Sequence, residues 1–380
     1  YQPLKWDIVY LPGWQAMSNA EDTLAENLAA AGYQTGFVTD TLPYFAPGFN
    51  FTRGFWQWEY VRGQQQDRWK SPFSLDENRL SRYQSLEEYR QDPHQLVPMH
   101  LANTAHVRRE EDTSTARVFQ WGMQFLEDNV NGQPFYLLVD CFDPHEPWEA
   151  PEPYYRMYGD ADYRGRRIVH CGYGPADEFG YTDEEIRYVQ AQYRGLVSLV
   201  DTWFGRLIQK LESLKLAENT IVFLLSDHGT NFCQNPRRVI GKPENSLYPG
   251  VMHLPFLMRM PGKTSGGVNN SLIYNLDLTR TIYDLAGVTP SNHQDGQSLL
   301  PLLGGGEQWQ PRSYVTCRYG HSLCYIDDKT WIIANIDGIP LEIFDLESDP
   351  ECRVNILAKA GRDRWKLAWD RLLADAGGSF

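Results

Sequence analysis

Amphipathic helical repeats alternate with short apolar runs along most of this chain. The longest repeat begins with the capping-box pair Thr182 and Glu185 and continues at helical spacing to about Leu216. The apolar run from Thr220 to Leu225 follows directly. Shorter units of the same kind precede it, namely a helix over Asp22–Ala31, a strand over Gln34–Asp40, a helix over about Thr104–Val130 and a strand over Pro134–Asp140. This alternation predicts an α/β fold, with a mostly parallel central sheet and helices on both of its faces.

The pattern changes after the three glycines at 304–306. SYVTCRYG, LCYIDD and WIIANI read as strands joined by hairpin-like turns. The tail from about Ala360 reads as a helix, with Trp365, Leu367 and Leu372 as its apolar anchors. We therefore expect a small C-terminal antiparallel sheet with a packed helix. The predicted domains are residues 1–309 and residues 310–380.

Charge and composition exclude several classes of function. The 380 residues carry a net charge of −14, which disfavours nucleic acid as a partner. No apolar run is long enough to span a bilayer, so no membrane partner is expected. The six cysteines form no Cys-x-x-Cys pair, which argues against structural zinc, and most should be small buried apolar groups. Because the chain does not begin with Met, a signal peptide cannot be judged. Localisation and oligomeric state stay open.

Two predicted strands end in residues that can do chemistry, and a lysine follows a little further on. One strand ends in Asp227-His228-Gly229, and the other leads into CFDPHEPW, which contains His145. Ligands of open α/β sheets gather at the carboxyl ends of strands, and a carboxylate beside an imidazole can form half of a divalent metal site. Taken singly, each residue also has a structural explanation. Strand-terminal aspartates often cap turns, His145 can hydrogen-bond a rigid loop, and Lys242 can be a solvated loop residue.

The order of several motifs resembles the sulfatase family of the alkaline-phosphatase superfamily. SDHG, GKPENSLYP and MHLPFLMRMPG follow one another as in the carboxyl half of that family. Upstream, FYLLVDCFDPHEPWEAPEPYYRMY and TLAENLAAAGYQT look like its active-site histidine loop and its entry helix. LEIFDLESDPECRVNI resembles its closing strand and turn. The resemblance runs from about Trp14 to the end, with a poor match over Ser71–His100.

The resemblance implies a metal-dependent sulfuric ester hydrolase. Asp227 and His228 would be metal ligands, with Ca²⁺ as the first choice and Mg²⁺ or Mn²⁺ as alternatives. The family's nucleophile is a formylglycine made within a Cys- or Ser-x-Pro-x-Arg motif, and no such motif occurs in these residues. The paired aspartates that open the family's fold also have no match near the start. The expectation is that this chain lacks the first βα units, that formylglycine lies outside it, and that alone it is inactive.

The same resemblance assigns catalytic and substrate-binding side chains. His145 would contact the sulfate or protonate the leaving oxygen, and Lys242 would contact the sulfate and neutralise charge. Thr39 and Thr41 occupy the stretch where many sulfatases have a lysine and a histidine lining the site. Pro43 stands where a related branch often has a histidine.

Three functions compete at this stage. The first is hydrolysis of a small-molecule or saccharide sulfate ester. The second is hydrolysis of phosphonate monoesters or phosphodiesters by the same superfamily. The third is a non-catalytic, degenerate homologue. Ser71–His100 and the aromatic group Phe55, Trp56, Trp58 and Tyr60 are candidates for shaping specificity, although such groups are more often core.

Overall fold

The computed structural model describes residues 16–380 except 65–66, 73–74, 76, 84–95, 133, 264–265, 304–308 and 361. The chain divides into two compact units. The N-terminal unit comprises Gln15–Cys171 and Tyr181–Ile221, and the C-terminal unit includes Gly172–Gly180 and Val222–Phe380. The glycines at 304–306 lie outside the described residues, and the domain boundary after residue 309 stays a prediction.

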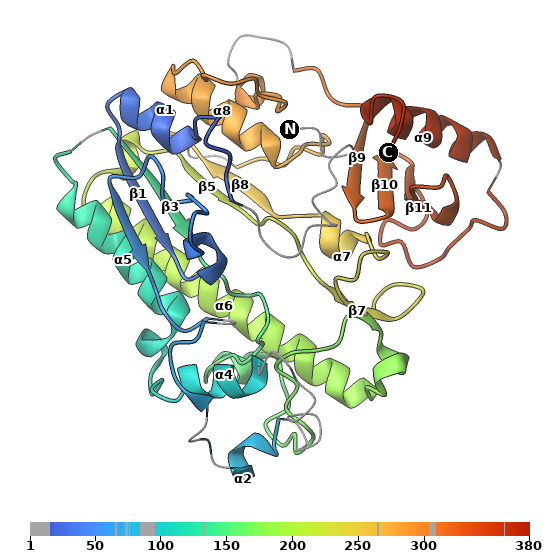
Figure 1. Cartoon of the computed structure of the whole chain (residues 1–380), viewed down its shortest axis with the longest axis horizontal. Helices are drawn as coiled ribbons and strands as arrows, with labels where there is room; N and C mark the ends of the chain where they lie inside the picture. Colours follow the sequence, from blue (N-terminus) through green and yellow to red (C-terminus); the bar gives the residue numbers. More distant parts are fainter. Residues whose placement is uncertain are drawn as a thin grey trace. The chain divides into compact units, whose positions relative to one another are not determined.

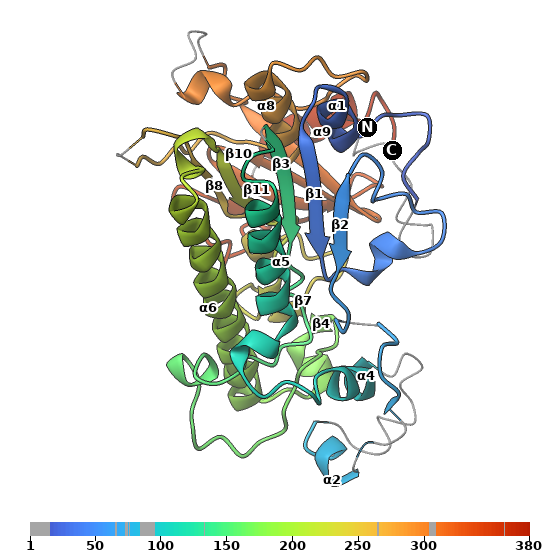
Figure 2. The ribbon, with the colours of Figure 1, turned by 90° about the vertical axis from the view of Figure 1, so that its left-hand side faces the viewer.

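The N-terminal unit is built on a parallel three-stranded sheet. Its order is β2 (Gln57–Tyr60), β1 (Gln34–Thr39), β3 (Phe135–Asp140). Thr39 at the end of β1 is in register with Tyr60 on one side and Asp140 on the other. The three strands point the same way in Figure 2, so their carboxyl ends meet at one edge. The predicted strands in β1 and β3 are confirmed.

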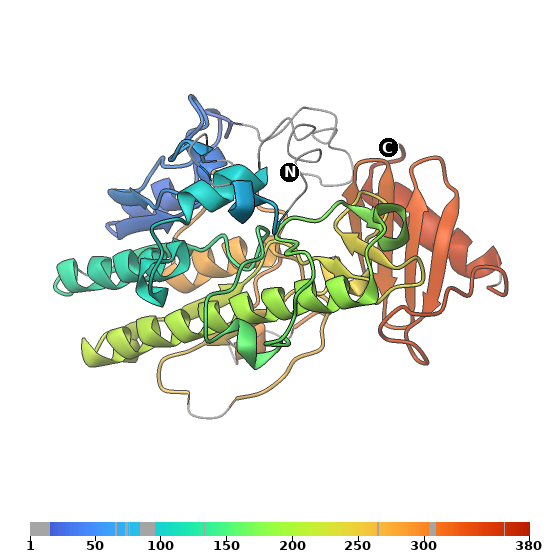
Figure 3. The ribbon, with the colours of Figure 1, turned by 90° about the horizontal axis from the view of Figure 1, so that it is seen from below.

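Helices cover this sheet. α1 (Leu24–Ala30), α5 (Ser114–Asp128) and α6 (Asp183–Ser213) are the principal ones, and α5 and α6 run side by side (Figures 2 and 3). Val118 of α5 packs on Val38 and Val139 of the sheet. Shorter elements of this unit are α2 (Glu77–Leu80), α4 (Leu96–Asn103), η2 (Leu42–Phe45), η4 (Glu110–Asp112), η5 (Tyr155–Met157) and η7 (Ala217–Asn219).

The helix predicted over Thr104–Val130 was wrong in its first ten residues. The chain turns after α4, forms the single 3₁₀ turn η4, and starts α5 only at Ser114. Thr113 is the N-cap, because its side chain accepts a hydrogen bond from the Ala116 N–H. The Asp112 carboxylate accepts the N–H groups of Arg108 and Arg109 at 3.0 and 3.1 Å, which holds the turn before the cap.

The C-terminal unit adds antiparallel strands. β5 (Val222–Leu225) pairs with β8 (Phe256–Arg259), and a small sheet has the order β4 (Gly174–Pro175), β7 (Val239–Gly241), β6 (Asn231–Phe232). Its short helices are η6 (Ala176–Phe179), α7 (Pro249–Met252), α8 (Leu276–Ala286) and η8 (Leu300–Leu303). Gly287 caps α8 in the left-handed conformation, with φ of 65°.

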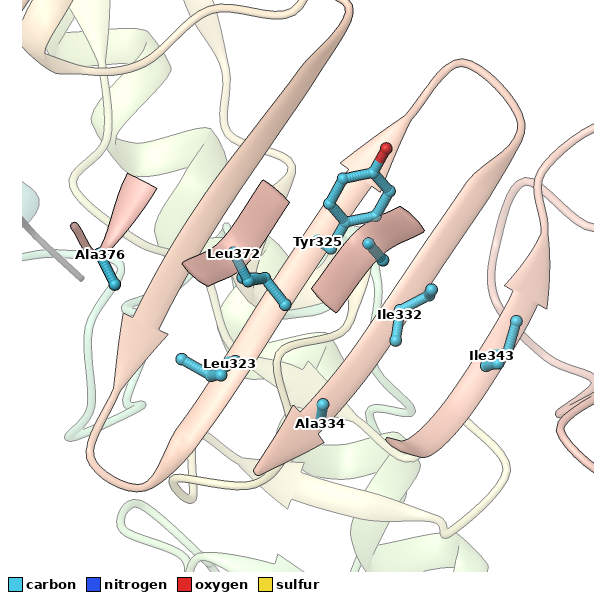
Figure 4. Close-up of a cluster of buried hydrophobic side chains, with 8 residues drawn as sticks. Leu323, Tyr325, Ile332, Ala334, Ile343, Leu372 and Ala376 are labelled. Atoms are coloured by element: carbon cyan, nitrogen blue, oxygen red, sulfur yellow. The ribbon is translucent and has the colours of Figure 1, made fainter. Parts of the chain in front are cut away.

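A four-stranded antiparallel sheet closes the chain. Its order is β12 (Pro340–Asp345), β11 (Thr330–Asn335), β10 (Ser322–Asp327), β9 (Tyr314–Tyr319), and α9 (Arg362–Asp375) packs on one face (Figures 1 and 4). The predicted sheet with its packed helix is confirmed. Ala368, Leu372 and Ala376 face the sheet at helical spacing, whereas the expected anchor Leu367 is 49% exposed. That anchor was wrong because Leu367 lies on the opposite side of α9 from this stripe.

The structure also bears on three expectations, which concern the cysteines, the aromatic group and membrane-spanning segments. All six cysteines are free thiols, and three of them are buried: Cys171, Cys324 and Cys352. Phe55 stacks on Phe37, whereas Trp56 is 77% exposed. Among the described residues, no helix is both long and apolar enough to cross a bilayer.

Candidate functional site

The turn after β5 presents Asp227 and His228 at the end of the strand. The Ser226 hydroxyl donates to the carbonyl of His228 at 2.8 Å, and the Asn275 side-chain amide donates to the carbonyl of Asp227 at 3.3 Å. The Gly229 N–H donates to the Val251 carbonyl at 2.9 Å. A Cβ at Gly229 would collide with the Gly250 carbonyl oxygen in α7, so glycine is required here for close approach of two backbones.

The hydrogen bonds of His228 orient its metal-binding atom. Nδ1 lies 2.9 Å from the Gly229 carbonyl oxygen, which can only accept, so Nδ1 carries the proton and Nε2 keeps its lone pair. Nε2 is 3.7 Å from Oδ2 of Asp227, whose side chain is 84% exposed. Metal–ligand bonds are about 2.0–2.6 Å long, so one ion can reach both atoms. The pair therefore fits a divalent metal.

Asp227 and His228 offer two possible donor atoms to a metal. Within the part of the chain that the structure describes, no group of three or more His, Cys, Asp or Glu side chains is arranged to hold a metal. The two donor atoms identified here are Asp227 Oδ2 and His228 Nε2.

Lys242 follows directly after β7 in the C-terminal unit, which also contains Asp227 and His228. Its Nζ lies 5.4 Å from the centroid of the Tyr173 ring, a cation–π contact. Gly241 beside it has φ of 75°, and a Cβ there would strike the same tyrosine ring. Tyr173 therefore limits where the ammonium group can lie. Sequence reasoning missed Tyr173, because it is far from Lys242 along the chain.

Thr39 and Thr41 both hydrogen-bond to Asp140 in the N-terminal unit. The Thr39 hydroxyl donates to Asp140 Oδ2 at 2.6 Å and the Thr41 hydroxyl donates to the same oxygen at 3.0 Å. The Thr41 N–H donates to the Thr39 hydroxyl oxygen at 2.9 Å. Both hydroxyl protons are thus directed at a carboxylate, and the expected role of these threonines towards substrate stays a prediction.

Two more carboxyls lie at the same edge of the sheet. Asp40 Oδ1 accepts the Phe142 N–H at 2.7 Å, while Oδ2 is buried without a hydrogen-bond partner among the described residues. Burial, and then the neighbouring Asp143, raise the pKa of Asp40 well above its ordinary value. Asp143 accepts hydrogen bonds from Thr115 and from Gln64. Sequence reasoning missed Asp40 and Asp140, although aspartates ending two adjacent parallel strands were a usable signal.

His145 lies in the loop after β3, and its Nδ1 contacts a backbone carbonyl of the same loop. Nδ1 is 2.7 Å from the Glu146 carbonyl oxygen and 3.5 Å from the buried Glu146 carboxylate. The Trp148 indole N–H donates to the Pro144 carbonyl at 3.0 Å and holds the loop. Since Nδ1 is bound to the backbone, Nε2 is the atom that can exchange a proton with a ligand.

The structure thus brings together Thr39, Thr41 and Asp140 in one unit, and Asp227 with His228 in the other.

Comparisons with families show two matches. Residues 8–288, more than half of the chain, match the family described as Sulfatase. Residues 244–368 match the family described as N-sulphoglucosamine sulphohydrolase, C-terminal.

Matches to individual proteins have low sequence identity. Over 247 residues the chain is 26% identical to a choline-sulfatase of Rhizobium meliloti, a match that covers 59% of this chain and 46% of the relative. Over 209 residues it is 28% identical to a human N-acetylglucosamine-6-sulfatase, covering 52% and 37% respectively. The chain therefore spans about half the length, or less, of these relatives. Among solved structures, the phosphonate monoester hydrolase of Agrobacterium radiobacter aligns with a TM-score of 0.69 and 19% identity, covering 95% of this chain and 81% of that one. That alignment shows the fold.

Proposed function

Because the chain belongs to the sulfatase family, we propose that it is part of a metal-dependent sulfuric ester hydrolase. The observation that carries this proposal is the pairing of Asp227 with His228. A carboxylate oxygen and an imidazole lone pair lie 3.7 Å apart at the end of a strand, held there by backbone hydrogen bonds.

Membership of this family implies a divalent metal and a formylglycine nucleophile. In the proposed enzyme Asp227 and His228 hold the ion, which when bound polarises the ester oxygens as a Lewis acid. Ca²⁺ is the family-based choice. An imidazole ligand suits Mn²⁺ better than the hard ions Ca²⁺ and Mg²⁺, so metal analysis decides between them.

The proton-transfer group of the proposed enzyme is His145. Its Nδ1 is bound to the Glu146 carbonyl, which leaves Nε2 to donate a proton to the leaving alcohol oxygen. For that step the ring must carry a proton on Nε2 as well as on Nδ1, and the buried Glu146 carboxylate lies 3.5 Å from Nδ1. Lys242 supplies a positive charge for the ester oxygens, held over Tyr173. Thr39 and Thr41, braced by Asp140, line the polar end of β1.

The proposed substrate is a small-molecule or saccharide sulfate ester. The human relative is named for a sulfated amino sugar, and the C-terminal family match also carries the name of one.

A phosphonate monoester or phosphodiester hydrolase is the second candidate. Thr39 and Thr41 put hydroxyls where many sulfatases put two cationic side chains, which changes the charge offered to the ester group. Turnover of an aryl sulfate compared with an aryl phosphonate ester separates the two functions.

The first prediction concerns metal and turnover in the full-length protein that contains this chain. Asp227→Ala should lose bound metal and nearly all turnover of 4-nitrophenyl sulfate. His145→Ala and Lys242→Ala should keep the metal and lower kcat by about 10²-fold or more, the size of acid–base and charge-stabilising effects. Mass spectrometry of bound metal and steady-state kinetics measure both quantities.

The matched control is Asp337→Ala, an exposed aspartate in the turn after β11, which should change neither quantity. Full metal content in Asp227→Ala would contradict the metal site. Near-normal kcat in both His145→Ala and Lys242→Ala would show that these residues have only a structural role.

A further inference from the structure

One buried asparagine follows the turn of Asp227 and His228 and contacts the loop that contains Lys242. Asn231 begins β6, three residues after His228, and its side chain is buried. Its backbone is in register with Gly241 of β7, the residue before Lys242. A buried amide needs hydrogen-bond partners to replace the water that it loses on folding. The partners of Asn231 therefore show which parts of the chain this side chain holds.

The side-chain amide of Asn231 donates to the backbone on both sides of Lys242. Its Nδ2 lies 3.1 Å from the Gly241 carbonyl oxygen and 3.1 Å from the Ser246 carbonyl oxygen. An amide NH₂ group has two protons, so each carbonyl can receive one of them. One buried side chain thus joins both ends of the Lys242 loop, residues 241–246, to β6.

The same loop also has hydrogen bonds of its own. The Ser246 hydroxyl donates to the Pro243 carbonyl at 2.6 Å, and the Tyr248 N–H donates to the Ser246 carbonyl at 2.8 Å. These bonds hold the loop in shape, and the cation–π contact with Tyr173 restrains the Lys242 side chain. The Asn231 amide adds the connection between this loop and the strand that follows the turn of Asp227 and His228.

The oxygen of the Asn231 amide faces the backbone that supports the turn after β5. A Cβ added to Gly250 of α7 would lie 3.3 Å from Asn231 Oδ1, so this oxygen is close to the α7 backbone. The Val251 carbonyl of the same helix accepts the Gly229 N–H of that turn at 2.9 Å. Asn231 is therefore placed to set the position of the Lys242 loop relative to the turn.

We propose that Asn231 is a positioning residue of the candidate site, which holds the Lys242 loop where the ammonium group reaches the oxygens of a sulfate group. This inference rests on the proposed function, in which Lys242 supplies a positive charge to those oxygens. Lysine is a point charge on a flexible stem, so its contribution depends on how firmly its backbone is held. A loop released from β6 holds the charge in place for only part of the time, and the apparent affinity for the anion falls by that fraction.

Calorimetry with inorganic sulfate, on the full-length protein that contains this chain, tests the inference. Asn231→Ala should raise Kd about three- to tenfold, because the released loop is in the binding position for a smaller fraction of the time. Lys242→Ala should raise Kd about tenfold, the size expected for loss of one charged contact. The double variant should bind no more weakly than Lys242→Ala, because the amide acts through that lysine. All titrations are made at a temperature where circular dichroism shows each variant to be folded.

The matched control is Asn235→Ala, in the turn of the same hairpin. The Asn235 side chain also bonds only to backbone in that turn, donating to the Val239 carbonyl at 3.2 Å and accepting the Val239 N–H at 2.9 Å. Asn235→Ala should therefore lower Tm and leave Kd for sulfate unchanged. A purely structural role of Asn231 would give this same pair of results.

A milder variant, Ser246→Ala, keeps the inference testable where Asn231→Ala does not fold. It removes the bond to the Pro243 carbonyl, loosens the same loop and should also raise Kd.

The outcomes separate this inference from the proposed function. A raised Kd in Lys242→Ala with an unchanged Kd in Asn231→Ala, or in Ser246→Ala where that variant replaces it, overturns the positioning role alone. Additive effects in the double variant overturn it as well, because the amide then acts independently of the lysine. An unchanged Kd in Lys242→Ala rejects the part of the proposed function that this lysine was given, and the positioning role with it.

Discussion

Two carboxyls in the N-terminal unit, the buried Asp40 and the partly buried Glu149, have pKa values shifted in opposite directions. Burial dominates at Asp40, which has another carboxyl close by, and its pKa is raised. Burial also acts on Glu149, but hydrogen bonds from His100 and Tyr83 prevail and lower its pKa to about 2. The chemistry of a side chain therefore depends on which groups the fold places next to it, and residue type alone does not decide it.

The residue-scale prediction is that Asp40→Asn stabilises the protein at neutral pH. A carboxyl whose pKa is raised on folding costs stability once the pH passes its unfolded value of 3.8. Asparagine removes the charge and keeps an oxygen for the Phe142 N–H. Thermal unfolding should show a higher Tm for the variant at pH 7 and a smaller difference at pH 4.

The control for this prediction is Glu149→Gln, which should have the opposite sign. A lowered pKa contributes stability that is present above the unfolded value of 4.5 and is lost as the pH falls towards 2. Glu149→Gln should therefore lower Tm at pH 7. A lower Tm for Asp40→Asn at pH 7 would contradict the assignment of a strained, buried carboxylate.

At the scale of elements, caps decide where helices begin. The capping boxes at Thr23 and Thr182 both form as hydrogen-bonded pairs with a glutamate three residues on. The start of α5 was misplaced because its N-cap, Thr113, has no glutamate in that position, and the preceding residues have no breaker such as proline. Local sequence signals are strong when both halves of the box are present.

The element-scale prediction concerns α6. Thr182→Ala removes the side-chain acceptor for the Glu185 N–H and should lower the free energy of unfolding by about 1 kcal/mol. Ser213→Ala at the other end of the same helix is the matched control, since this exposed hydroxyl donates to the Lys210 carbonyl of its own helix and alanine is the better helix former. Urea titration measures both. An equal or larger loss in Ser213→Ala would show that the cap contributes little.

At the scale of the whole molecule, negative charge is in excess. The chain has 49 acidic and 35 basic residues, and self-repulsion at this imbalance works against the compact state. Many ion pairs of the described residues are at the surface, where each contributes only about 0–1 kcal/mol. Added salt should therefore weaken the repulsion between like charges more than it weakens the attraction within these pairs.

The whole-molecule prediction is that Tm rises by a few degrees when NaCl increases from 20 to 200 mM at pH 7.5, because the Debye length falls from about 20 Å to below 10 Å. Calorimetry measures it. At pH 5, near the isoelectric point of about 5.1, the rise should vanish. A fall in Tm with salt at pH 7.5 would mean that attractive pairs outweigh the net charge.

The sequence by itself determined most helices and strands and the C-terminal sheet, because caps and periodicity are properties of neighbouring residues. The candidates Asp227, His228, His145 and Lys242 came from the order of motifs and its resemblance to the sulfatase family, and their roles stay predictions.

Only the tertiary structure decided which distant groups meet. Asp140 meets Thr39 and Thr41 across about a hundred residues of chain, and Trp69 meets Arg117. Such contacts depend on how strands align and on where the connecting turns lead, and no local pattern encodes them. The chemistry of buried side chains, such as the raised pKa of Asp40, arises from that packing.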